Sequence, residues 1–102
     1  MIGKYKVITL CGSTKFKDDF EKELKRLTLE GNIVLTVALW GHSGDNEVLN
    51  DDVKTMLDDM HKRKIDMADE IFVINKNGYI GTSTKSEIEY AINHNKKVNY
   101  ME

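Results

Sequence analysis

Four short apolar segments alternate with three longer segments of helical periodicity, and this alternation restricts the possible folds more than any other feature of the chain. The apolar segments, which are rich in β-branched residues, are Val7–Cys11, Ile33–Leu39, Glu70–Ile74 and Lys97–Met101. The helical segments are Lys15–Glu30, a second that follows Asn50 and runs to about Met67, and a third from Thr84 to about Asn93. Such alternation is typical of βαβ units and a parallel sheet.

The ends and the buried faces of the helices follow from the same pattern. Asn50 is a good N-cap for the second helix, and Gly31 follows the first helix where a left-handed C-terminal cap is common. Apolar residues at helical spacing mark the faces that we expect to be buried. These residues are Phe16, Phe20, Leu24 and Leu27 in the first helix, Val53, Met56, Leu57 and Met60 in the second, and Ile88, Ala91 and Ile92 in the third.

The order of these elements limits the topology. Crossovers between parallel strands are right-handed, and elements adjacent in sequence tend to be adjacent in space. We therefore expect a single domain over residues 1–102, a three-layer flavodoxin-like or Rossmann-like α/β fold with three main helices and a parallel sheet of strand order 2-1-3-4. Ligands bind beyond the carboxyl ends of the strands where the strand order reverses. The expected crevice lies between the loops Gly12–Lys15 and Asn75–Ser83.

The composition argues against several classes of protein. Of the 102 residues, 40% are hydrophobic and 31% are charged, which is typical of a soluble globular domain. The net charge of −2 provides no basic surface for a nucleic-acid duplex. No apolar run has the length of a membrane span or of a signal peptide. A single cysteine, Cys11, cannot form an internal disulfide, so we expect a reducing, cytoplasmic location.

The first glycine-containing loop carries Gly12, Ser13, Thr14 and Lys15 between the first strand and the first helix. Glycine allows close approach of the backbone, and hydroxyl groups and free amides at a helix start can hold an anion. The loop is neither a dinucleotide fingerprint nor a triphosphate-binding loop. We expect it to bind an anion or a sugar, and the alternative is a plain turn with Ser13 or Thr14 as N-cap.

The second loop leads from Gly81 through Ser83 and Thr84 to Glu87. Thr84 and Glu87 have the spacing of a capping box, in which the Glu side chain returns to the amide of the N-cap residue. In the functional interpretation, Glu87 is instead a carboxylate at the mouth of the crevice. Both interpretations remain open from local spacing.

Three further groups are candidates. Trp40 and His42 follow the second strand, where an exposed tryptophan either stacks on a planar base or covers the edge of the core. His61 and Asp66 lie on the helix before the third strand. Since the three histidines lack metal-ligand spacing and one cysteine cannot build a thiolate site, we predict no metal.

Three segments together resemble the nucleoside 2-deoxyribosyltransferase-like superfamily, which includes 2′-deoxynucleoside 5′-monophosphate N-hydrolases. The segments are Ile8–Ser13, Ala68–Ile74, and the glycine-rich loop leading to Ser86–Ala91 and Lys96–Val98. The resemblance covers most of the chain, although each motif is short.

The resemblance implies cleavage of an N-glycosidic bond with Glu87 as the nucleophile that attacks C1′ of a deoxyribose, without a cofactor. It also implies that the Gly12–Ser13 loop and the amides near Ser83 and Thr84 hold a 5′-hydroxyl or a 5′-phosphate. The chain departs from the family at two positions. Lys15 stands where the family often has Arg, and the family's catalytic Asp aligns with His61. Asp66 is then the nearest later carboxylate, and His61 is itself a possible proton donor.

Two alternatives remain beside a nucleoside or nucleotide N-glycosidase or deoxyribosyltransferase. One is a non-catalytic nucleotide-binding or sensor domain that keeps the loops and has lost the acid. The other is a cyclic or adenine-nucleotide-related hydrolase of the wider flavodoxin-like group. The fold alone does not separate these three functions.

We also expect a homodimer or a higher homo-oligomer. One helix cannot cover four strands, of which the first three are apolar on both faces, and a large exposed apolar patch usually marks an interface. The resemblance adds to this expectation, since family members form oligomers with shared sites. The alternative is a monomer in which Tyr5, Trp40 and the long loops cover the bare face.

Overall fold

The computed structural model describes residues 3–37 and 50–102, and it confirms the predicted α/β fold. All three strand pairs are parallel, and the strand order is β2-β1-β3-β4. The strands are β1 (Val7–Gly12), β2 (Ile33–Leu35), β3 (Glu70–Ile74) and β4 (Lys97–Tyr100). The helices are α1 (Lys17–Leu29), α2 (Asp51–Met67) and α3 (Thr82–Asn93), with short 3-10 turns η1 (Thr14–Phe16) and η2 (Lys76–Gly78).

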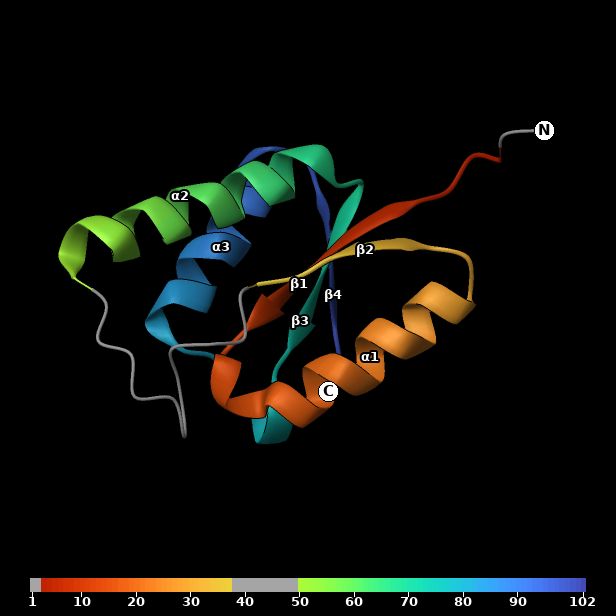
Figure 1. Ribbon diagram of the computed structural model, residues 1–102, viewed down its shortest axis with the longest axis horizontal. Helices are drawn as coiled ribbons and strands as arrows, with labels where there is room; N and C mark the ends of the chain where they lie inside the picture. Colours follow the sequence, from red (N-terminus) through yellow and green to blue (C-terminus); the bar gives the residue numbers. More distant parts are fainter. Residues whose placement is uncertain (1–2, 38–49) are drawn as a thin grey trace.

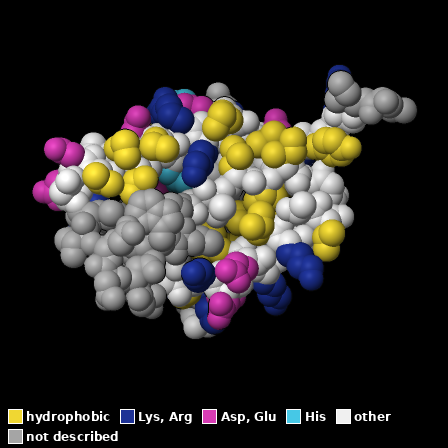
Figure 2. Space-filling model, in the orientation of Figure 1, with side chains coloured by type: hydrophobic (Ala, Val, Ile, Leu, Met, Phe, Trp, Pro, Cys, Tyr) yellow, Lys and Arg dark blue, Asp and Glu magenta, His cyan; other side chains and the backbone are white. Residues whose placement is uncertain are grey.

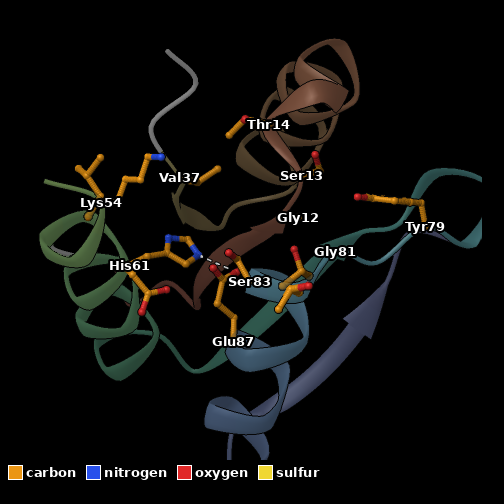
Figure 3. A pocket seen from close by; sticks show the side chains of 14 residues that line it. Gly12, Ser13, Thr14, Val37, Lys54, His61, Tyr79, Gly81, Ser83 and Glu87 are labelled. Carbon is orange, nitrogen blue, oxygen red and sulfur yellow. Dashed lines mark ion pairs between the residues drawn. The ribbon is translucent and has the colours of Figure 1, made fainter. Parts of the chain in front are cut away.

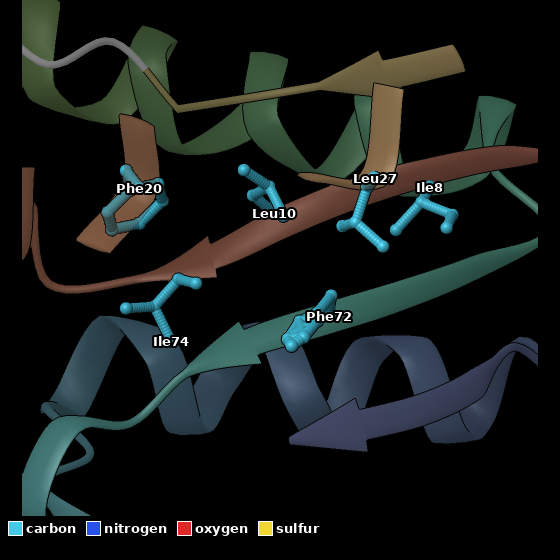
Figure 4. Close-up of a cluster of buried hydrophobic side chains, with 6 residues drawn as sticks. All are labelled: Ile8, Leu10, Phe20, Leu27, Phe72 and Ile74. Atoms are coloured by element: carbon cyan, nitrogen blue, oxygen red, sulfur yellow. The ribbon is translucent and has the colours of Figure 1, made fainter. Parts of the chain in front are cut away.

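The elements form three layers, with α1 on one face of the sheet and α2 and α3 on the other (Figure 1). Each interface has its own cluster of buried side chains. The cluster between α1 and the sheet contains Ile8, Leu10, Phe20, Leu27, Phe72 and Ile74 (Figure 4). The cluster on the opposite face contains Cys11, Ile65, Ile71, Val73 and Ala91. Side chains of β1 alternate between the two faces, so Cys11 points toward α2 and α3.

Two predicted helix ends are confirmed by their hydrogen bonds. The Asn50 side chain accepts a bond of 2.8 Å from the Val53 amide, as an N-cap does. After α1, Gly31 adopts a φ of 98°, and its amide donates to the Thr28 carbonyl. The Asn32 amide donates to the Leu27 carbonyl, which completes the left-handed C-terminal cap that the glycine predicts.

Of the two interpretations left open for Thr84 and Glu87, the structure excludes the capping box. The helix α3 begins two residues earlier than expected, at Thr82, and its N-cap is Gly81, without a side-chain cap. Thr84 is therefore already inside the first turn and is buried. The Glu87 side chain is consequently not needed at the helix start and lies in the interior instead.

Two predicted buried faces and one strand also need correction. Met56 and Met60 are about half exposed, with 51% and 47% of their surface accessible, and the buried residues of α2 are His61 and Ile65. The inward face of α2 follows steps of four residues, which places a histidine where an apolar side chain was expected. Ile92 of α3 is likewise exposed. The second strand ends at Leu35, because its pairing with β1 stops there.

The apolar face that motivated the expected homodimer is largely covered. The six residues of the α1 cluster are buried, and the Arg26 guanidinium lies over the Phe72 ring at 5.5 Å. Figure 2 shows hydrophobic side chains along the α2 region of the molecule, where Met56 and Met60 are exposed. The homodimer therefore remains a prediction.

No helix within residues 3–37 and 50–102 is long and apolar enough to cross a membrane.

Candidate functional site

A pocket of about 460 Å³ lies at the carboxyl ends of β1 and β3, where the strand order reverses. This volume is within the range of small-molecule sites. Figure 3 shows that its walls come from the loop after β1, from α2 and from the start of α3. Eight of the residues predicted from the sequence line it: Gly12, Ser13, Thr14, His61, Gly81, Ser83, Thr84 and Glu87.

The predicted residues that do not line this pocket have other surroundings. The carboxylate of Asp66 accepts a bond of 2.7 Å from the Tyr90 hydroxyl, and it pairs with Arg63 at 2.8 Å. The Lys15 ammonium lies 3.5 Å from the centre of the Tyr79 ring, a cation–π contact. Trp40 and His42 lie outside the described residues.

Gly12 ends β1 beside β3 in a conformation that favours glycine, with a φ of 144°. A Cβ atom at this position would lie 2.7 Å from the Ile74 carbonyl oxygen and 3.3 Å from the Phe20 ring. These contacts indicate that a side chain at Gly12 would first disturb the packing of β1 against β3.

The loop after Gly12 and the start of α3 at Gly81 both line the pocket. Ser13 caps the turn η1, where its hydroxyl accepts a bond of 3.3 Å from the Lys15 amide. The amides in the first turn of α3 have no intrahelical partner, and they lie at the pocket wall with Gly81, Ser83 and Thr84. A helix start of this kind attracts an anionic group.

Glu87 and His61 face each other across the inner end of the pocket (Figure 3). His61 Nε2 is 3.5 Å from Glu87 Oε1 and 3.4 Å from Cys11 Sγ. Both side chains are nearly enclosed, with 5% of the His61 side chain and 10% of the Glu87 side chain exposed. Three elements supply this cluster, since Cys11 is on β1, His61 is on α2 and Glu87 is on α3.

Burial dominates the acid–base behaviour of this cluster. Removal from water raises the pKa of Glu87 to about 7, and the nearby Asp58 carboxylate adds to that increase. Removal from water lowers the pKa of His61 to about 4, assisted by the Lys64 charge. Burial and the neighbouring Glu87 raise the pKa of the Cys11 thiol well above its usual value. At neutral pH, His61 is therefore a neutral imidazole beside a carboxyl group that is partly ionised.

Several pocket residues were not identified from the sequence. Lys54 and Asp58 line the pocket from α2, and Tyr79 lines it from the loop before α3. The spacing of Lys54, Asp58 and His61 places them on one face of a helix, which is a signal that the sequence contains. Cys11 shares the α2 side of β1 with Thr9, whose hydroxyl donates to the Lys64 carbonyl at 2.9 Å.

The chain matches no family model, and no curated protein matches it.

Proposed function

We propose that this protein cleaves the N-glycosidic bond of a nucleoside or of its 5′-monophosphate, with Glu87 as the nucleophile. One observation carries the proposal: Glu87 is a buried carboxyl group at the inner end of the pocket that neither caps its helix nor pairs with a Lys or Arg among the described residues. A carboxyl group that burial disfavours in its charged form, and that lines a cleft, is a typical functional group.

The pocket walls fit the parts of such a substrate. The free amides at the start of α3 suit an anionic 5′ group, and the Lys54 ammonium adds a positive charge. Val37 and Leu57 form an apolar wall on which the base would lie. The deoxyribose would then lie between these two regions, with C1′ facing Glu87.

The reaction would proceed in two displacements. The Glu87 carboxylate attacks C1′, the bond from C1′ to the base nitrogen breaks, and its electron pair leaves with the base, which gains a proton. Water then attacks C1′ of the glycosyl ester, releasing the sugar and restoring the carboxylate. The proton that the leaving base gains comes from water, because the Asp58 carboxylate that lines the same pocket is paired with the Lys62 ammonium at 3.2 Å. The neutral state of His61 does not favour it as the acid.

The test is the release of free base from a panel of deoxynucleosides and their 5′-monophosphates, followed by chromatography. We expect at least one substrate to release base, and Glu87→Gln to reduce the rate by orders of magnitude. Glu89→Gln is the matched control, because Glu89 is an exposed carboxylate on the same helix and outside the pocket. Absence of base release with every substrate, or equal loss in both variants, would contradict the proposal.

A non-catalytic nucleotide-binding domain is the second candidate. The observation that favours it is the neutral His61 at the position where the resembled family has its catalytic Asp. One experiment distinguishes the two functions. A binding domain would bind a 5′-monophosphate equally well in the original protein and in Glu87→Gln, and it would release no base.

A further inference from the structure

Three potential metal ligands of different chemistry converge at the inner end of the pocket. They are the Cys11 thiol, the His61 imidazole and the Glu87 carboxyl group, and their ligand atoms all lie within 4.8 Å of one another. All three residues are buried, and they come from β1, α2 and α3. These three residues are far apart in the sequence and form no ligand motif, which is why the sequence indicated no metal.

Two of the three distances between these ligand atoms match those of a tetrahedral zinc site. Zinc bonds of about 2.3 Å to sulfur and about 2.0 Å to nitrogen or oxygen, at tetrahedral angles, place neighbouring ligand atoms roughly 3.3–3.6 Å apart. His61 Nε2 lies 3.4 Å from Cys11 Sγ and 3.5 Å from Glu87 Oε1. Two of the three distances between ligand atoms therefore already have the length that a tetrahedral zinc ion requires.

The donor set and its burial also suit zinc. A thiolate, an imidazole nitrogen and a carboxylate oxygen are the ligands that Zn²⁺ prefers, and the thiolate disfavours Mg²⁺ and Ca²⁺. A dication with one thiolate and one carboxylate forms a site with no net charge, which reduces the cost of burying both anions. His61 and Glu87 line the pocket, so the fourth position is open to water from that side.

Without a metal ion, the three groups form hydrogen bonds among themselves, including one from the Cys11 thiol to the Glu87 carboxyl group. His61 Nε2 carries either one proton or one lone pair, so it forms one good hydrogen bond with only one of its two neighbours. A metal ion would engage the sulfur, the nitrogen and the oxygen together.

We propose that Cys11, His61 and Glu87 bind one Zn²⁺ ion, and that the bound ion holds the Glu87 carboxylate and thereby prevents its attack on a substrate. The inhibitory part rests on the proposed function, whereas the metal site does not.

Titration of the EDTA-treated protein with Co²⁺ tests the site without reference to activity. We expect visible bands of tetrahedral Co²⁺, a thiolate-to-cobalt charge-transfer band, saturation at one ion per chain and displacement by Zn²⁺. Because the chain has a single cysteine, that charge-transfer band can come only from Cys11. Cys11→Ala should abolish it and weaken Zn²⁺ binding by roughly 100-fold or more, since even the loss of a group supporting a ligand costs about 10–100-fold.

The control is His94→Ala, because His94 is an exposed histidine outside the cluster, and it should bind Co²⁺ unchanged. His61→Ala and Glu87→Gln provide the same test as Cys11→Ala if that variant does not fold. Absence of the charge-transfer band, or equal Zn²⁺ binding by the original protein and by the folded ligand variants, would overturn the metal site.

The inhibitory part has a separate readout. If base release is detected, Zn²⁺ should inhibit the original protein at concentrations that saturate the cobalt-binding site, and Cys11→Ala should require at least a tenfold higher concentration, on the order of the loss seen for weakened sites. Equal inhibition of both would refute this part. A charge-transfer band without base release would support the metal site and contradict the proposed function, and base release without a band would do the reverse.

Discussion

Replacing Glu87 with Gln should stabilise the protein in a manner that depends on pH. The pKa of Glu87 is about 7 in the folded state, compared with 4.5 for a free carboxyl group. Below about pH 4.5 the carboxyl group is protonated in both states and carries no penalty. As the pH rises, the unfolded chain loses its proton first, so the stability falls until Glu87 also ionises in the folded state near pH 7.

The magnitude follows from the difference between the two pKa values. At 1.36 kcal/mol per pKa unit, the penalty is about 3 kcal/mol at about pH 8, and it is about 1 kcal/mol at about pH 5. Glutamine keeps the shape of the neutral acid and has no charge to bury. The gain in free energy of unfolding from Glu87→Gln should therefore be about 2 kcal/mol larger at the higher pH.

Urea unfolding of both proteins at the two pH values measures this difference. The depressed pKa of His61 has the opposite effect, because it makes stability rise with pH between about 4 and 6.5, but both proteins retain that residue. Glu89→Gln, at an exposed position of the same helix, should show no comparable dependence. If the difference in free energy of unfolding between Glu87→Gln and the original protein is the same at both pH values, the argument that burial raises the pKa of Glu87 is refuted.

Further outcomes follow from the same structure. Base release should increase with pH through about 7, because only the ionised Glu87 is a nucleophile, and a pH–rate profile that is flat across neutrality would contradict this. Gly12→Ala should lower the free energy of unfolding by about 1–3 kcal/mol in urea unfolding, since its Cβ would lie 2.7 Å from a backbone oxygen. Asn50→Ala should cost about 1 kcal/mol by removing the N-cap of α2, and unchanged unfolding would show that the cap is dispensable. Light scattering on a size-exclusion column tests the predicted homodimer, which a mass near 11.7 kDa would exclude.

The sequence by itself determined the order of the elements, the strand order and the position of the crevice. These features depend on short-range periodicity, on the handedness of parallel crossovers and on the point where the strand order reverses. The hydrogen bonding at two helix ends could also be predicted from the sequence, namely the N-cap at Asn50 and the C-terminal cap at Gly31. Each of the two caps depends on only a few neighbouring residues.

Only the tertiary structure determines which groups the buried polar side chains contact. The spacing of Thr84 and Glu87 allowed a capping box, but α3 begins at Thr82, and Glu87 turns toward residues from two other elements. The face of α2 that is buried depends on how that helix lies on the sheet, so His61 replaces Met60 in the interior. The contact between Cys11 and His61 joins residues that are fifty positions apart, and no local pattern determines which distant side chains share one desolvated space.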